Sequence, residues 1–408
     1  MPLLSREERT TMTRWLYLLL LAAPAAVLAE ALRAPPLVTF VLASLGLVPL
    51  AGLIGQATEV LAERLGHGIG GLLNATFGNA AEIIIGLTAL AAGLPEVVRA
   101  SLAGSIIGNV LLVLGTAMLV GGWRYRRQQF HPRVAGQYAT MLALVVIGMA
   151  VPSLLATIGE STRPGAAVVR GNQLHQLSLG IALILLACYA AYIAYSVFGV
   201  RASHTDVLPL SPSPVGTEAG ASDHPGHMKA FEGMASTRHQ TTLGSLLAAL
   251  AVWWRTTLWL PIVILAGTTA VTAVVSEVLV STIEPLTHQI GLSPFFVGLI
   301  ILPIVGNAAE HFSAITSAAR NHMEISMAIT AGSSIQIALL AAPILVLAGP
   351  LVGVPLDLNF SLLEVALFAL VAGLYALISL DGESTWLEGL LLCAFYLILA
   401  VGTFLTPA

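Results

Sequence analysis

The chain has 408 residues, of which 57% are hydrophobic and only 9% are charged, and its mean hydropathy is +0.90. Ordinary soluble domains carry about 25% charged residues, so this composition excludes a water-soluble protein and predicts one that crosses a bilayer repeatedly. The net charge is −4 and no basic stripe is present, so we expect no nucleic-acid partner.

Residues 1–34 hold a first apolar run, from Trp15 to Leu32. The run is longer than the apolar core of a cleaved signal peptide, and another apolar run follows almost at once. We therefore expect a retained N-terminal transmembrane helix.

Apolar windows of about 20 residues or more, long enough to cross a bilayer, recur along the chain. They predict an all-α polytopic membrane protein with eleven transmembrane helices: one N-terminal helix, a five-helix repeat in 35–199 and a second in 257–408. The windows are 14–32, 36–58, 69–93, 97–121, 135–158, 174–199, 257–281, 294–318, 325–350, 359–380 and 385–405.

Residues 200–256 separate the two groups. Most of this segment is rich in Ser, Pro, His and Thr, which predicts a flexible linker. Leu246–Trp254 is a candidate interfacial helix because tryptophans favour the headgroup region. Histidines at 204, 224, 227 and 239 could bind a metal, but a solvated linker explains them more simply.

Basic residues are distributed unevenly between the two sides of the predicted membrane. Of the 17 Lys and Arg residues, thirteen fall on the side of the N-terminus and four on the other. Cytoplasmic loops are enriched in Lys and Arg, so we expect the N-terminus and the linker in the cytoplasm. Because five is an odd number, the second group of five helices begins on the opposite side from the first. The two groups are then inverted repeats.

The pentapeptide GNAAE occurs twice, at Gly78–Glu82 and Gly306–Glu310, and both copies lie in otherwise apolar windows. The offset of 228 residues also superimposes Gly104-Ser105 on Gly332-Ser333. A carboxylate inside a membrane helix costs about 2.5–3.5 kcal/mol even on lenient scales, so it is rarely present for packing alone. One such carboxylate in each half is typical of a transporter whose site lies between repeats.

Asn79 and Asn307 precede the motif glutamates by three residues, so each Asn and Glu share a helix face. Glycines just before them favour a helix kink that bares backbone carbonyls. Two carboxylates, two amide oxygens and such carbonyls form a hard oxygen set that suits Ca²⁺. Without the ion, burial and mutual repulsion favour protonated carboxyls, so one pair could hold Ca²⁺ or protons in turn. Protonated glutamates that only close helix contacts are the alternative.

Other polar residues in the apolar windows extend this candidate site. Ser105 and Asn109 share a helix face, and Ser333 (or Ser334) and Gln336 mirror them; small-residue helix packing is the alternative explanation. Glu59 and Glu277 are candidate proton-relay or entrance carboxylates, or residues that simply reach water at the interface. His311 could assist proton transfer or be a buried, hydrogen-bonded histidine. Glu364 has no assigned role.

At these motifs the sequence resembles the calcium/proton exchanger family of the cation/calcium exchanger superfamily. The resemblance covers both repeats. Its segments are TEVLAERLG, GGLLNATFGNAAEIIIGLTAL and ASLAGSIIGNVLLVLG in the first half, and SEVLV, GLSPFFVGLIILPIVGNAAEHFSAI and ISMAITAGSSIQIALLAAPILVL in the second.

The resemblance implies an eleven-helix fold, a central site built on Glu82 and Glu310, and movement of cytoplasmic Ca²⁺ against protons. Sodium-coupled relatives have Ser/Thr-rich motifs beside the acid, where this chain has Ala80-Ala81 and Ala308-Ala309. Alanine methyl groups cannot ligate an ion, so sodium coupling is disfavoured. The acidic helix that members often carry between the halves is missing from the linker, which puts its regulatory role in doubt here.

Other classes of protein fit less well. HExxH, GxSxG and P-loop motifs are absent, so we expect neither an enzyme nor coupling to ATP. A cation channel lined by acids is the remaining rival. The prediction is therefore a calcium/proton antiporter with no cofactor and Ca²⁺ as its transported substrate. A short, Arg-rich chain suggests the plasma membrane of a prokaryote, with a vacuolar membrane as the alternative; a homo-oligomer is compatible with the sequence.

Overall fold

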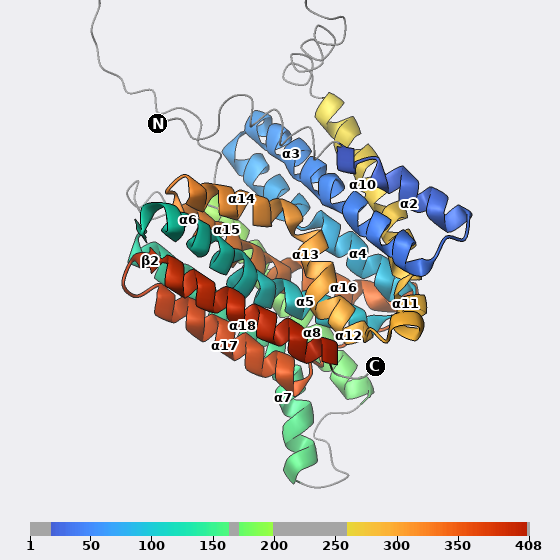
Figure 1. The fold of residues 1–408 in the computed structure, drawn as a ribbon. Helices are drawn as coiled ribbons and strands as arrows, with labels where there is room; N and C mark the ends of the chain where they lie inside the picture. Colours follow the sequence, from blue (N-terminus) through green and yellow to red (C-terminus); the bar gives the residue numbers. More distant parts are fainter. Residues whose placement is uncertain (1–17, 163–170, 199–258, 406–408) are drawn as a thin grey trace, which may run out of the picture.

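The structure is a computed structural model that describes residues 18–162, 171–198 and 259–405 (Figure 1). Seven helices in these ranges are long and apolar enough to cross a membrane, or eight if one bent pair forms a single span. Three shorter apolar helices lie in other predicted windows, so the helical membrane fold is confirmed and the count of eleven stays a prediction. The predicted linker and its histidines lie outside the described residues.

The first half of the chain is almost entirely helical. Two of its segments meet at the GNAAE motif, and a π-helix (η1) interrupts another. The elements are α2 (Ala22–Ala31), α3 (Pro36–Phe77), α4 (Ala80–Ala91), α5 (Pro95–Gly108), η1 (Asn109–Leu114), α6 (Gly115–Tyr125), β1 (Arg127–Gln129), α7 (Pro132–Thr162) and α8 (Asn172–Phe198).

The second half follows a similar order with more interruptions, including the π-helices η2 and η3 and the 3₁₀-helix η4. The elements are α10 (Trp259–Ser281), α11 (Ile283–Ile290), α12 (Pro294–Phe296), η2 (Val297–Ile301), α13 (Leu302–Gly306), α14 (Ala308–Ala319), α15 (Met323–Gln336), η3 (Ile337–Ala341), α16 (Ala342–Ala348), η4 (Gly349–Val352), α17 (Leu362–Ile378), β2 (Glu383–Thr385) and α18 (Trp386–Leu405).

Both GNAAE motifs break their helices, as the sequence predicts. Asn79 separates α3 from α4, and Asn307 separates α13 from α14, where the chain bends by 62°. Glycine and asparagine are both poor helix formers. Glycine loses the most backbone entropy in a helix, and the asparagine side chain bonds to nearby backbone groups in turns. A new helix therefore begins directly after each motif asparagine, with the glutamate in its first turn.

Two π-helices occupy equivalent places in the two halves. η1 begins at Asn109 and η3 at Ile337, which are 228 residues apart, each four residues after the serine of its Gly-Ser pair. Single π-turns within α-helices are frequent at functional sites because they redirect side chains locally. The two halves thus share a local irregularity at the position where polar residues were predicted.

Three helices, α2, α3 and α10, pack together, and α10 also packs along α4 (Figure 1). α5 and α15 are the most buried long helices, and they lie in the interior. We call the end of the molecule that carries β1 and β2 the ribbon face, and the opposite end, which carries α11, the α11 face (Figure 1).

Two features depart from the sequence-based expectation. β1 and β2 form an antiparallel ribbon, with Arg127 opposite Thr385, in a chain expected to be wholly helical. α3 also continues as one helix, Pro36–Phe77, from the second predicted window into the third. In the second half Gly291, at φ +73°, and Pro294 break the chain at the corresponding place.

Candidate ion-binding site

The two GNAAE turns meet in the middle of the molecule. A methyl group on Gly306 would lie 3.4 Å from Cγ and 3.9 Å from Cδ of Glu82, so the first glutamate packs directly over the second motif. Glu82 and Glu310 are near enough for their charges to repel each other. Each carboxyl sits in the first turn of a helix, where the helix dipole favours negative charge. The structure therefore brings the two predicted carboxyls into one site.

A ring of buried amide and hydroxyl groups joins α5 and α15 to the motif turns. None of these six side chains is more than 6% exposed. The bonds are Asn79 Nδ2 to Gln336 Oε1 (2.7 Å), Asn109 Nδ2 to Ser333 Oγ (3.1 Å) and Asn307 Nδ2 to Ser105 Oγ (3.1 Å). All six had been predicted as site residues, and the structure places them together.

These bonds use the amide nitrogens and leave oxygens free. Oδ1 of Asn79 and Asn307 and Oε2 of Glu82 and Glu310 are buried, with no hydrogen-bond partner in the described parts of the chain. A buried acceptor without a partner costs about 1–3 kcal/mol. Four such oxygens from two repeated motifs form a donor set for a hard cation.

The two repeats do not pair in the same way. Asn307 bonds to Ser105, but its counterpart Asn79 bonds to Gln336 instead of Ser333. Ser333 instead accepts a hydrogen bond from Asn109. The adjacent Ser334 donates to Thr330 O within its own helix, and the choice between the two serines as a site residue stays a prediction.

The remaining predicted residues lie outside this ring. Glu59 is half-buried in α3, and His311 is half-buried beside Glu310 on α14. Glu277 is exposed on α10, on the side away from that helix's buried face. Their proposed roles in proton transfer or entry stay predictions.

Glu364 has a structural role that the sequence could have revealed. It accepts hydrogen bonds from the backbone N–H and hydroxyl of Ser361 at the start of α17, in a capping box. The spacing Ser-x-x-Glu before an apolar run is the signal for this arrangement.

Two glycines mark a tight helix contact between the site and the α11 face. A methyl group on Gly104 of α5 would overlap the Leu299 carbonyl oxygen and lie 2.7 Å from Pro303 Cγ. A methyl on Gly298 would lie 2.7 Å from Ala100 Cβ. These glycines let α5 and η2 approach closely on the side of the α11 face.

The equivalent glycine of the second repeat has different surroundings. Gly332 lies 228 residues after Gly104 and is also buried, but a methyl group there would meet no atom of the described side chains within 4 Å. The residues 228 positions before Leu299 and Pro303, which contact Gly104, are Gly71 and Ala75, and they lie outside the described side chains.

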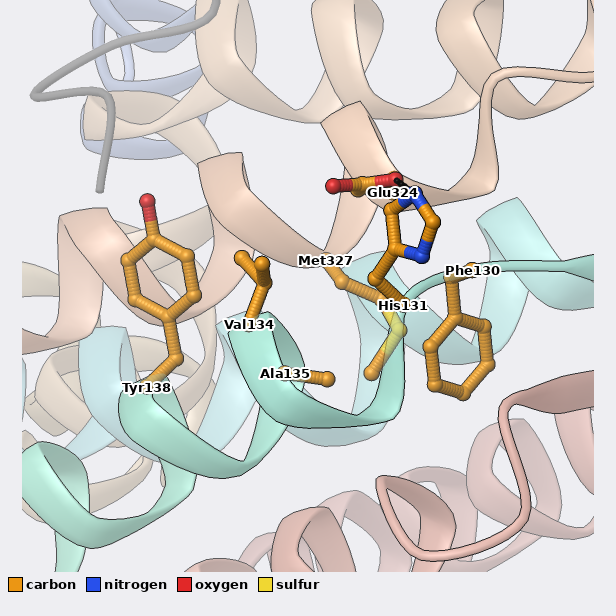
Figure 2. A pocket seen from close by; sticks show the side chains of 7 residues that line it. All are labelled: Phe130, His131, Val134, Ala135, Tyr138, Glu324 and Met327. Carbon is orange, nitrogen blue, oxygen red and sulfur yellow. Dashed lines mark ion pairs between the residues drawn. The ribbon is translucent and has the colours of Figure 1, made fainter. Parts of the chain in front are cut away.

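A small pocket at the ribbon face does not belong to this site. Its volume is about 10 Å³, close to that of a single water-sized probe, and none of its lining residues was predicted to bind an ion. Figure 2 shows His131, at the start of α7, beside Glu324 at the start of α15; His131 Nε2 lies 4.0 Å from Glu324 Oε2. This pair joins two helix ends.

Acidic side chains with buried, unpartnered oxygens in a fold of apolar membrane-length helices are typical of membrane transporters of cations. Solved structures share this fold. Native YfkE is 32% identical, with a TM-score of 0.73 over 96% of this chain and 99% of that one. The H⁺/Ca²⁺ exchanger CAX is 14% identical, with a TM-score of 0.64 over 98% of this chain and 89% of that one, which shows a common fold.

The chain belongs to the sodium/calcium exchanger protein family, which it matches over residues 35–198 and 260–405. It is 38% identical to a Ca²⁺/H⁺ antiporter of Aphanothece halophytica (95% of this chain, 96% of the relative). It is 34% identical to the Ca²⁺/H⁺ antiporter ChaA of Bacillus subtilis (97% and 100%) and 36% identical to vacuolar cation/proton exchanger 4 of Arabidopsis thaliana (96% and 81%). The calcium/proton exchanger branch indicated by the motifs is thereby confirmed.

Proposed function

We propose that the protein is a secondary antiporter that exchanges Ca²⁺ for protons by alternating access, with Glu82 and Glu310 shared between the two ions. The observation that carries this proposal is the set of four buried, unpartnered oxygens on the two motifs. Relatives with the printed name Ca²⁺/H⁺ antiporter, which match nearly the whole chain, support the choice of ions.

The chemistry of the shared pair follows from charge balance. Ca²⁺ takes six to eight oxygen ligands, so the four free oxygens would be completed by water or main-chain carbonyls. Two carboxylates neutralise the ion in a region of low dielectric. When the ion leaves, their mutual repulsion favours uptake of protons. If only the loaded forms change conformation, calcium and proton movements are coupled.

The unequal environments of Gly104 and Gly332 support alternating access. In this proposal the close packing at Gly104 shuts the side of the α11 face, and the ribbon side, where no described side chain contacts a methyl group on Gly332, is the side that opens. Exchange of these two arrangements between the repeats would open the opposite side. The ribbon face carries Arg126, Arg127 and Arg320, so we assign it to the cytoplasm and this conformation to an inward-open state.

The residues beside the acids favour protons over sodium as the coupling ion. Ala80, Ala81, Ala308 and Ala309 offer no side-chain oxygen next to the carboxyls. A sodium ion bound in addition to Ca²⁺ would need such ligands. With bacterial relatives among those matched, we place the protein in the plasma membrane, and a vacuolar membrane remains the alternative.

Calcium flux in proteoliposomes tests this proposal. A pH gradient alone should drive Ca²⁺ uptake, and an equal sodium gradient should not. Glu82→Gln and Glu310→Gln should each abolish exchange while the protein still folds, and Glu96→Gln, at an exposed position, serves as the matched control. Uptake driven only by sodium, near-normal exchange by both motif variants, or flux indifferent to either gradient would each contradict the proposal; the last would indicate a channel.

A further inference from the structure

Buried hydroxyl groups without partners line one face of α10. Thr272 and Ser276 are fully buried, and they lie four residues apart on that face. The hydroxyl oxygens of both, and that of Ser44 on α3, have no hydrogen-bond partner in the described ranges. Ser44 and Thr272 lie on the first long helix of each predicted repeat, α3 and α10.

Nearby serines and threonines show that the helix offers partners. Thr269 donates to Leu265 O at 2.7 Å, Ser281 to Val278 O at 2.9 Å, and on α3 Thr58 donates to Ile54 O at 2.8 Å. A buried hydroxyl without a bond is less favourable than an apolar side chain of the same size. In this conformation Thr272 and Ser276 therefore stabilise the fold no more than valine and alanine would.

The position of the row relates it to the ion site. α10 packs against α3 and along α4, the helix whose first turn holds Glu82 (Figure 1). Thr272 and Ser276 lie on the half of α10 that leads to Ser281 and the α11 face. On that side α5 packs tightly against η2 and α13 at Gly104. Any route from the site to the α11 face has to open between helices that are packed in this state.

We propose that Thr272, Ser276 and Ser44 line the passage through which cations move between the site and the α11 face in the alternate, outward-open conformation. This inference rests on the proposed function. A hydroxyl both donates and accepts hydrogen bonds, so it suits the water shell of Ca²⁺ as well as water that carries protons. Because it is uncharged, it does not hold the ion as a carboxylate would, and passage requires weak binding.

Thiol accessibility tests where the passage runs. The background has Cys188 and Cys393 replaced by serine, and a membrane-impermeant thiol reagent is added at the α11 face of right-side-out vesicles. We expect Thr272→Cys and Ser276→Cys to react faster, by about tenfold or more, when combined with Gly104→Ala, a change that disfavours the closed contact. Thr269→Cys, on the neighbouring face of α10, is the control and should not respond.

Ala100→Cys reports independently whether this side has opened, since Ala100 packs against Gly298 at the closed contact. Reaction at Ala100→Cys without reaction at Thr272→Cys or Ser276→Cys would overturn the inference. Failure at this point leaves the ion site untouched, because the experiment does not involve the motif glutamates.

Transport provides the second test. Thr272→Val and Ser276→Ala should each lower the maximal Ca²⁺ flux by roughly threefold to tenfold, the loss expected for one hydrogen bond. Equilibrium Ca²⁺ affinity should stay within about twofold, because neither residue belongs to the donor set. Thr272→Ser keeps the hydroxyl and should transport normally, as should Thr269→Val. Normal flux through the combined Thr272→Val and Ser276→Ala variant would overturn the inference, even if Glu82→Gln abolishes exchange as proposed.

Discussion

Gly104→Ala is the most informative single change, because its effect follows from geometry. The added methyl would overlap the Leu299 carbonyl oxygen and come within 2.7 Å of Pro303 Cγ. A backbone carbonyl cannot rotate away as a flexible side chain can. Overpacking of this kind costs about 1–3 kcal/mol. That cost falls on the conformation closed at the α11 face, so the equilibrium should shift away from it by roughly 5- to 150-fold.

Gly332→Ala is the matched control at the equivalent position of the other repeat. No described side chain lies within 4 Å of its added methyl, so the conformation proposed to be inward-open should accept it at little cost. In the outward-open state α15 would have to make the close contact that α5 makes here. Gly332→Ala should therefore favour the inward-open state, the opposite of Gly104→Ala.

The assay is the reaction of Ala100→Cys, on a background without Cys188 and Cys393, with an impermeant thiol reagent added at the α11 face. Gly104→Ala should accelerate it and Gly332→Ala should slow it. Both substitutions should lower the maximal rate of exchange, since each penalises one of two states that must alternate. Equal reactivity in both variants, with unchanged exchange, would refute the reasoning from the repeats.

Three further predictions concern stability and pH. Gln128→Met removes the amide that donates to Ala318 O at 2.8 Å and holds the end of α14, so it should lower the free energy of unfolding by about 1–3 kcal/mol, measurable as a fall in Tm. Ser361→Ala removes the capping box at α17 and should lower the free energy of unfolding by about 1 kcal/mol. Ser361→Thr keeps the hydroxyl and should leave Tm unchanged. Equal Tm values for the wild type and both variants would contradict the assignment. Protons compete with Ca²⁺ for the two motif carboxyls. Calorimetry should therefore show the Ca²⁺ affinity falling as pH falls, by up to about 100-fold per pH unit where both carboxyls are protonated. An affinity independent of pH would exclude a pair shared between the two ions.

Some of the site follows from the sequence because its signals are local. A carboxylate in an apolar window is costly wherever the window lies in the fold, so Glu82 and Glu310 stand out without coordinates. Asn79 and Asn307 follow from their spacing to those acids on a helix. The Ser-x-x-Glu signal at Ser361 was equally local and was overlooked.

Other parts depend on contacts between distant segments. Gln336 bonds to Asn79, 257 residues away, whereas the position 228 residues before Gln336 is Gly108, which has no side chain to bond to Asn307. The importance of Gln128 depends on its reaching Ala318, 190 residues away. Threonines on α10 look alike in the sequence, and only packing shows that Thr269 has a partner and Thr272 does not.

By itself, the sequence determined that this is a helical membrane protein, that its halves repeat with two intramembrane acids, and which exchanger family it resembles. These follow from composition, spacing and the cost of charge in hydrocarbon, which are properties of short stretches of chain. Only the tertiary structure decided which buried oxygens are without partners in the described ranges and how tightly the helices pack at Gly104. The physical reason is that both depend on contacts between segments far apart in the chain, such as Gly104 with Leu299.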